Sequence, residues 1–200
     1  MFDALKKAYA KSRLKDDRYA FLFDTPPDDE WVAFDCETTG LDAKTAEIIS
    51  IAAVKIRGSS VLTSESLHIF VRPSKAVSED SIKVHHIRNA DLQGAVEPSE
   101  AMDRFLHFIG ARRLVGYYLE FDVAMVDRYL KSIIGVGLPQ EKIEVSALYF
   151  DKKHSVFNSH TPDLRFESIL KELGVPTLAR HSAIADAIMT ALIFVKLKAS

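Results

Sequence analysis

The stretch WVAFDCETTGLD, residues 31–42, decides the fold of this 200-residue chain. Its first four residues form an apolar run with β-strand character, and the turn signal Thr39-Gly40 closes the segment. Side chains two apart in a strand share a face, so Asp35 and Glu37 lie on one face, one pleat apart. Adjacent carboxylates repel each other and are costly to bury without a cation. This spacing therefore fits a hydrated strand end and a metal site about equally well.

The apolar patterns on both sides of this stretch predict an α/β fold. The order of elements is βββ and then α-β-α-β-α-α, which argues for one mixed sheet of three antiparallel strands followed by parallel strands, flanked by helices. The expected strands are 31–34, 48–56, 61–71, 114–117 and 143–145. The expected helices are 101–109, 122–133, one that opens at 161–162 and runs to 173, and 184–195, with a polar loop over 152–163.

The composition is that of a globular protein. Apolar residues make up 48% and charged residues 27% of the chain, which excludes a disordered or collagen-like protein. No uninterrupted apolar run approaches the roughly 18 residues of a membrane span, so no membrane contact is expected. The net charge of −2 provides no general basic surface, so any contact with phosphates must be local. The single cysteine, Cys36, cannot form an intramolecular disulfide, which fits a reducing, cytoplasmic location.

Residues 1–29 are expected to form an N-terminal helical extension and linker in front of a domain over 30–200. Residues 1–20 carry six basic and three acidic side chains, with apolar residues at helical spacing. The Pro- and Asp-rich cluster at 25–30 then ends any helix. Packing of the extension against the outside of the domain is the simpler interpretation, and a partner-binding arm is the alternative.

Three further residues break the apolar pattern at the ends of predicted elements. Asp122 opens a helix directly after a strand, where an acid taken alone favours the helix dipole. Asp186 lies inside the apolar run AIADAIMTALIFV. His181 precedes it by five residues, and the two side chains converge best if the histidine lies on the loop or first turn before the helix.

Together with the strand-end pair, these residues make four acids and one histidine. Four hard oxygen ligands without cysteine suit Mg²⁺ or Mn²⁺ rather than structural zinc. A carboxylate cluster that holds two such ions about 4 Å apart is an arrangement that cleaves phosphodiesters. An imidazole, with a pKa of about 6.5, suits the role of general base.

Three segments resemble the motifs of the DEDDh-type 3′–5′ exonucleases, a family that includes the proofreading epsilon subunit of bacterial DNA polymerase III. They are FDCETTGLD (34–42), Phe121-Asp122 before a helix, and HSAIADA (181–187), and the resemblance covers residues 30–198. It implies a ribonuclease-H-like fold and two bound divalent cations, Mg²⁺ or Mn²⁺. It also implies that the metal ligands are Asp35, Glu37, Asp122 and Asp186 and that His181 is the general base.

The resemblance further implies which residues contact the substrate. They are Thr38, Leu41, His85 and Phe121. His86 stands where the family has glycine. The middle motif departs from the family, because Tyr117 and Tyr118 occupy the two positions that usually hold His-Asn. The chemistry is expected to survive since the carboxylate is present, whereas the substrate preference is open.

We therefore expect a metal-dependent exonuclease that releases nucleoside monophosphates from the 3′ end of single-stranded or frayed DNA. An RNA-directed exonuclease or oligoribonuclease would share the catalytic set and is the first alternative. A nucleic-acid-binding module of the same fold without catalysis is the second. The chain ends fourteen residues after Asp186, so we expect a stand-alone enzyme or one that meets a protein partner through its N-terminal helix.

Overall fold

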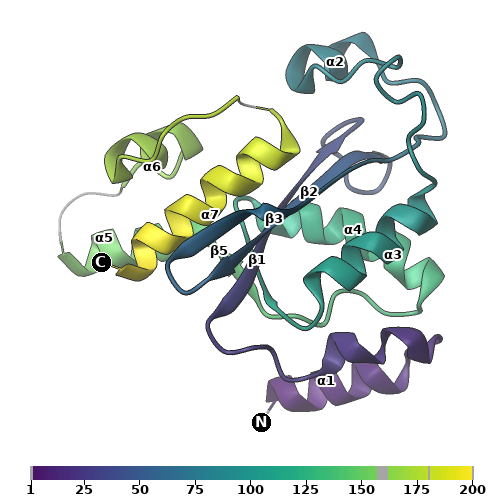
Figure 1. Ribbon diagram of the computed structural model, residues 1–200, viewed down its shortest axis with the longest axis horizontal. Coiled ribbons are helices and arrows are strands. Elements are labelled where there is room, and N and C mark those ends of the chain that lie inside the picture. Colours follow the sequence, from purple (N-terminus) through teal and green to yellow (C-terminus); the bar gives the residue numbers. More distant parts are fainter. Residues whose placement is uncertain (1, 157–161, 180, 200) are drawn as a thin grey trace.

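Helices cover both faces of a central sheet (Figure 1). The computed structural model describes residues 2–156, 162–179 and 181–199. Helices α3 (Pro98–Ile109) and α4 (Leu119–Ile133) pack on one face, and α7 (Ala183–Ala199) crosses the other. The remaining helices are α1 (Phe2–Ser12), the 3₁₀ helix η1 (Asp17–Phe23), α2 (Glu79–His85), α5 (Val145–Val156) and α6 (Phe166–Leu173). Within the described ranges, no helix combines the length and apolar character that crossing a bilayer requires.

The sheet has five strands in the order β3-β2-β1-β4-β5. β2 pairs antiparallel with both β1 and β3, whereas β4 pairs parallel with both β1 and β5. The predicted mixed sheet is therefore confirmed. The strands are β1 (Glu30–Thr38), β2 (Ile48–Arg57), β3 (Ser60–Phe70), β4 (Arg113–Gly116) and β5 (Lys142–Glu144).

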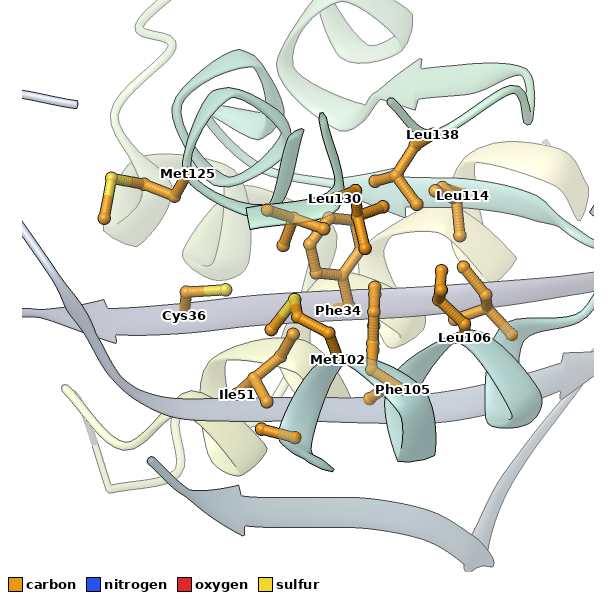
Figure 2. Close-up of a cluster of buried hydrophobic side chains, with 14 of the residues drawn as sticks. Phe34, Cys36, Ile51, Met102, Phe105, Leu106, Leu114, Met125, Leu130 and Leu138 are labelled. Atoms are coloured by element: carbon orange, nitrogen blue, oxygen red, sulfur yellow. The ribbon is translucent and has the colours of Figure 1, made fainter. Parts of the chain in front are cut away.

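One face of β1 belongs to the hydrophobic core beneath α3 and α4. Val32, Phe34 and Cys36 are at most 9% exposed and point to this face. Figure 2 shows Phe34 among side chains of α3 and α4, and its ring centroid lies 5.2 Å from that of Phe105. This core fixes the position of the strand, since interiors are packed as densely as organic crystals.

The other face of β1 changes character along the strand. Trp31 and Ala33 are buried under α7, where Trp31 packs on Phe194 with ring centroids 5.2 Å apart. Asp35 and Glu37 follow on the same face, because side chains alternate along a strand. The pairing of β1 with β2 shifts register between Glu37 and Thr38, and the strand ends at Thr38, one residue after the second carboxylate.

Parts of the helical prediction are wrong. The predicted polar loop over 152–163 begins inside α5, which runs to Val156; residues 157–161 of that loop lie outside the described residues. The helix expected to open at 161–162 begins at Phe166. The short helix α2 was not predicted. The helices expected at 101–109, 122–133 and 184–195 are confirmed.

The N-terminal segment contributes to the core. The 3₁₀ helix η1 buries Tyr19, Leu22 and Phe23 against the face that α3 and α4 cover, and the Tyr19 hydroxyl donates to Asp103 at 2.7 Å. On α1, by contrast, Leu5 is 65% exposed. Within the predicted extension, η1 is thus packed on the domain, while α1 presents apolar surface to solvent.

Candidate active site

A pocket of about 590 Å³ opens where β1 ends. It lies between the C-terminal half of β1, α2 and the N-terminal turns of α4 and α7. The structure brings every site residue expected from the sequence to its lining: Asp35, Glu37, Thr38, Leu41, His85, Phe121, Asp122, His181 and Asp186. Residues that are 151 positions apart along the chain therefore meet at one point.

Three carboxylates form the centre of the pocket. Asp35 and Glu37 come from β1 and Asp186 from the first turn of α7, and each offers an oxygen within 4.8 Å of the other two. Alanines such as Ala183 and Ala187 are buried beside Asp186 and let α7 approach the sheet closely. Clustered carboxylate oxygens are the ligands that Mg²⁺ and Mn²⁺ prefer, so the donor set fits a divalent cation.

The fourth carboxylate reaches the pocket from the opposite face of the sheet. Asp122 lies on the first turns of α4, is 5% exposed, and accepts a hydrogen bond from the backbone amide of Cys36 at 3.1 Å. β4 pairs with β1 only as far as Ala33. The Cys36 amide lies beyond that pairing, and Asp122 accepts its hydrogen bond in place of a strand. Burial raises the pKa of Asp122 to about 8. A carboxyl group held in this way binds either a proton or a cation at neutral pH.

Another acid, Glu144, which the sequence analysis did not single out, positions α4. Glu144 at the end of β5 accepts a hydrogen bond from the backbone amide of Leu119, the first residue of α4, at 2.9 Å. It thereby replaces the side-chain cap that Tyr118 does not provide. Gly116, the last residue of β4, permits this close approach, because a Cβ atom there would lie 2.9 Å from Leu119 Cβ.

His181 precedes α7 and is exposed at the pocket edge. Its φ of 58° is left-handed, which is uncommon outside glycine and keeps the residue out of the helix. The predicted position on the loop before the helix is confirmed. An imidazole on such a loop is accessible to water, as a general base must be.

His85 ends α2 and is 4% exposed. Its Nδ1 accepts a hydrogen bond from the amide of Ile87 at 3.0 Å, so a neutral ring carries its proton on Nε2. Nε2 is buried without a hydrogen-bond partner among the described residues. Burial also lowers the pKa of His85, which favours this neutral donor form. The next residue, His86, has a φ of 60°, a left-handed conformation that glycine adopts without strain.

The remaining predicted contacts lie on the loop after β1 and on α4. The Thr38 hydroxyl donates to the carbonyl of Gly40 at 2.7 Å, which shapes the turn. Leu41 is 91% exposed at the tip of this loop, whereas Phe121 is half-buried on α4. We call the exposed apolar lining residues Leu41, Val84 and Tyr118 the rim and the four carboxylates with His85 the floor, and we count the exposed His181 in neither group.

Two residues that sequence reasoning missed hold this loop in place. Arg128 of α4 donates from Nη1 to the carbonyl of Ala43 at 2.8 Å and from Nη2 to the carbonyl of Ala46. Ser81 of α2 donates to the carbonyl of Thr39 at 2.8 Å. Neither contact has a local signal in the sequence, because each joins segments that are about 40 to 85 positions apart.

Comparison with known proteins agrees with this geometry. DNA polymerase III subunit epsilon of Aquifex aeolicus is 30% identical over 173 residues, which cover 85% of this chain and 81% of that protein. The PolC-type DNA polymerase III of Thermotoga maritima is 30% identical over 169 residues, 84% of this chain; the chain spans only 12% of that longer relative.

Solved structures share the fold at lower identity. Exonuclease X in complex with 5′ overhanging duplex DNA superposes with a TM-score of 0.64 at 20% identity. The match covers 84% of this chain and 91% of the exonuclease X chain. Escherichia coli exonuclease I in complex with a dT13 oligonucleotide superposes with a TM-score of 0.69 at 15% identity. The match covers 84% of this chain and 41% of the exonuclease I chain. Residues 32–194 match the model of the exonuclease family RNase_T. The chain therefore belongs to this family, as a DEDDh-type 3′–5′ exonuclease domain.

Proposed function

We propose that this protein hydrolyses the terminal phosphodiester bond at the 3′ end of single-stranded or frayed DNA by a two-metal mechanism with His181 as general base. The observation that carries the proposal is the convergence of three carboxylates within 4.8 Å, in a pocket that Asp122 and His181 also line. Gathering four carboxylates in one place, with Asp122 buried, is costly unless cations compensate their charge.

The carboxylates divide into two groups by geometry. Asp35, Glu37 and Asp186 would hold one divalent cation, and Asp122 would help to hold a second beside it. When bound, Mg²⁺ or Mn²⁺ would activate water and stabilise the charge that develops on the phosphate and the leaving oxygen. Asp122 keeps its place through its bond to the Cys36 amide, whichever protonation state it adopts.

The other residues bind and orient the substrate. His181 takes a proton from the attacking water as its oxygen bonds to phosphorus and the bond from phosphorus to the 3′ oxygen of the preceding nucleotide breaks. The leaving 3′ oxygen takes a proton from solvent, so the products are a nucleoside 5′-monophosphate and a strand with a new 3′ hydroxyl. His85 offers its Nε2 proton to an oxygen of the terminal nucleotide, while Leu41 and Phe121 pack on its base.

DNA is the proposed substrate for two reasons. The chain is 30% identical to a DNA polymerase III epsilon subunit over most of both proteins, and the exonuclease I and exonuclease X structures of the same fold contain DNA. In addition, a pocket that binds one strand end needs few phosphate contacts, which fits the net charge of −2.

The experiment is degradation of matched 5′-labelled DNA and RNA oligonucleotides with Mg²⁺, with Mn²⁺ and with EDTA. We expect stepwise release of mononucleotides from DNA that requires the metal. Activity should fall on the order of 10³-fold in Asp35→Asn and by about 10²- to 10⁴-fold in His181→Ala. Asp151→Asn, an exposed acid on α5 outside the pocket, is the matched control and should retain activity.

Three results would contradict the proposal. Full activity in EDTA would exclude the metal mechanism, and full activity in His181→Ala would exclude this general base. Faster degradation of RNA than of DNA would show that the protein is an RNA-directed exonuclease rather than a DNA-directed one.

A further inference from the structure

The rim of the pocket carries an unusual share of the exposed apolar surface. In the described part of the chain, seven large apolar side chains are exposed, and Leu41, Val84 and Tyr118 among them line this pocket. Exposed apolar groups that gather at the mouth of a pocket mark a ligand-binding surface. Tyr118 is the aromatic member of this group and is 74% exposed.

The backbone holds Tyr118 in an uncommon conformation. With φ of 53° and ψ of 33°, the residue is left-handed at the N-cap of α4. Asparagine, which related exonucleases usually carry there, adopts this conformation several times more readily than an aromatic residue does. Tyr118 makes no side-chain cap there, so the strain of this conformation points to a role for its exposed ring in ligand contact.

A second aromatic residue supports the ring from behind. Tyr117 meets Tyr118 edge to face, with centroids 5.0 Å apart, and packs on Phe166 at 4.7 Å. The Tyr117 hydroxyl donates to the carbonyl of Leu164 at 3.0 Å. The two tyrosines that replace His-Asn therefore form one unit, in which Tyr117 is anchored and Tyr118 presents a ring to solvent.

We propose that Tyr118 is a stacking platform for the base of the second nucleotide from the 3′ end. The proposal rests on the proposed function, because the carboxylates of the floor then fix the scissile phosphate. The terminal nucleotide fills the pocket, and the next nucleotide, on the other side of that phosphate, leaves across the exposed rim where Tyr118 lies. Aromatic rings bind bases of any sequence through their π faces. A base that stacks on Tyr118 has left the duplex, so this contact selects single-stranded or frayed ends.

The test compares substrates that differ only in this base. Two DNA oligonucleotides carry either thymine or an abasic residue at the second position from the 3′ end. The p-nitrophenyl ester of thymidine 5′-monophosphate serves as a third substrate, because it has no second nucleotide. The proteins are the wild type, Tyr118→Asn, Tyr118→Phe and, as a matched exposed tyrosine on α1, Tyr9→Ala.

We expect removal of the base to lower kcat/KM of the wild type by about 5- to 150-fold, the range of one stacked base. In Tyr118→Asn, whose new residue suits the left-handed backbone, the two oligonucleotides should differ by less than about twofold. Tyr118→Phe keeps the ring, so its kcat/KM should differ between the thymine and abasic oligonucleotides as much as that of the wild type does. Tyr9→Ala should show the same difference. The ratio of oligonucleotide to ester turnover should fall only in the asparagine variant.

Two outcomes would overturn the proposal. One is a Tyr118→Asn variant that still discriminates between thymine and the abasic residue as the wild type does. The other is an equal loss on the ester and the oligonucleotides, which would place the ring at the terminal nucleotide. Failure of the proposed function looks different, since the wild type would then hydrolyse none of the substrates. Fluorescence anisotropy of both oligonucleotides in EDTA would in that case still test the stacking contact.

Discussion

The floor and the rim of the pocket are built in opposite ways. Floor residues come from the central strand β1, from α4 and α7 on opposite faces of the sheet and from α2, and Asp122 and His85 are at most 5% exposed. Rim residues lie on loops and helix ends, where Leu41 is 91% and Tyr118 is 74% exposed. The floor is thus held by the core, whereas each rim side chain is free to change without disturbing packing.

This difference separates chemistry from selection. Substitutions in the floor should abolish the reaction or alter the stability of the protein, because the floor holds the clustered carboxylates and the buried His85. Substitutions in the rim should change which strand binds and how tightly, with little effect on the fold. Four predictions test this division.

Loss of one floor carboxylate should have the largest effect. Asp186→Asn keeps the size of the side chain but removes one of the three charges that lie within 4.8 Å of each other. Turnover should fall on the order of 10³-fold, together with calorimetric Mn²⁺ binding, while the melting temperature is maintained or rises. Unchanged Mn²⁺ affinity would show that Asp186 is not a metal ligand and would contradict the assignment of the chemistry to the floor.

Asp122→Asn should stabilise the metal-free protein in a pH-dependent way. Burial raises the pKa of this carboxyl from 3.8 to about 8 in the folded state. The wild type therefore loses stability as the pH rises from about 4 to 8, because only the unfolded chain is easily deprotonated there. Asparagine has no such loss and can still accept the Cys36 hydrogen bond.

The variant should melt about 4 to 8 °C above the wild type near pH 8 in EDTA, which corresponds to about 2 kcal/mol of relieved burial. The gain should shrink near pH 5, and Mg²⁺ should raise the melting temperature of the wild type more than that of the variant. A gain that is equal at both pH values would contradict the raised pKa.

Arg128 links the floor to the rim. Its side chain donates to the carbonyls of Ala43 and Ala46 and so holds the loop that carries Leu41. Arg128→Ala should raise KM for DNA oligonucleotides about tenfold, since two charge-assisted hydrogen bonds position the loop. Arg128→Lys should not restore binding, because a single ammonium group cannot reproduce the planar fork. A fall in kcat without a rise in KM would instead place Arg128 with the floor.

Leu41→Ala should give the smallest effect. The side chain is exposed in the free protein, so its removal leaves no cavity and the melting temperature should stay within about 1 °C. Loss of its contact with the terminal base should raise KM about fivefold and leave kcat unaffected. Leu5→Ala, at a comparably exposed leucine on α1, is the control. A large drop in kcat for Leu41→Ala would show that the rim takes part in the chemistry.

The floor was predictable from the sequence because local geometry determines most of it. Strand alternation alone places Asp35 and Glu37 on one face, and a helix that follows a strand brings Asp122 to the same end of the sheet. His181 was expected before its helix because a residue inside the helix would point away from Asp186. The structure confirms this position.

Other features depend on contacts that no local pattern encodes. α5 was taken in part for a loop because its sequence is polar, yet Val145 and Tyr149 are buried and the Tyr149 hydroxyl bonds to Glu172 of α6. Glu144 resembles an ordinary strand-end acid until β5 lies beside α4. Such long-range partners become visible only when the chain is folded.

The hydrogen bond between the Cys36 amide and Asp122 makes the sheet itself a sensor of the reaction centre. Any event that changes the charge of that carboxyl, whether a proton or an ion arrives, alters the electron density at an amide near the C-terminal end of the central strand. In a ¹⁵N-labelled sample, the Cys36 resonance would therefore follow occupancy of the site directly. It would do so without any label on the substrate and without turnover.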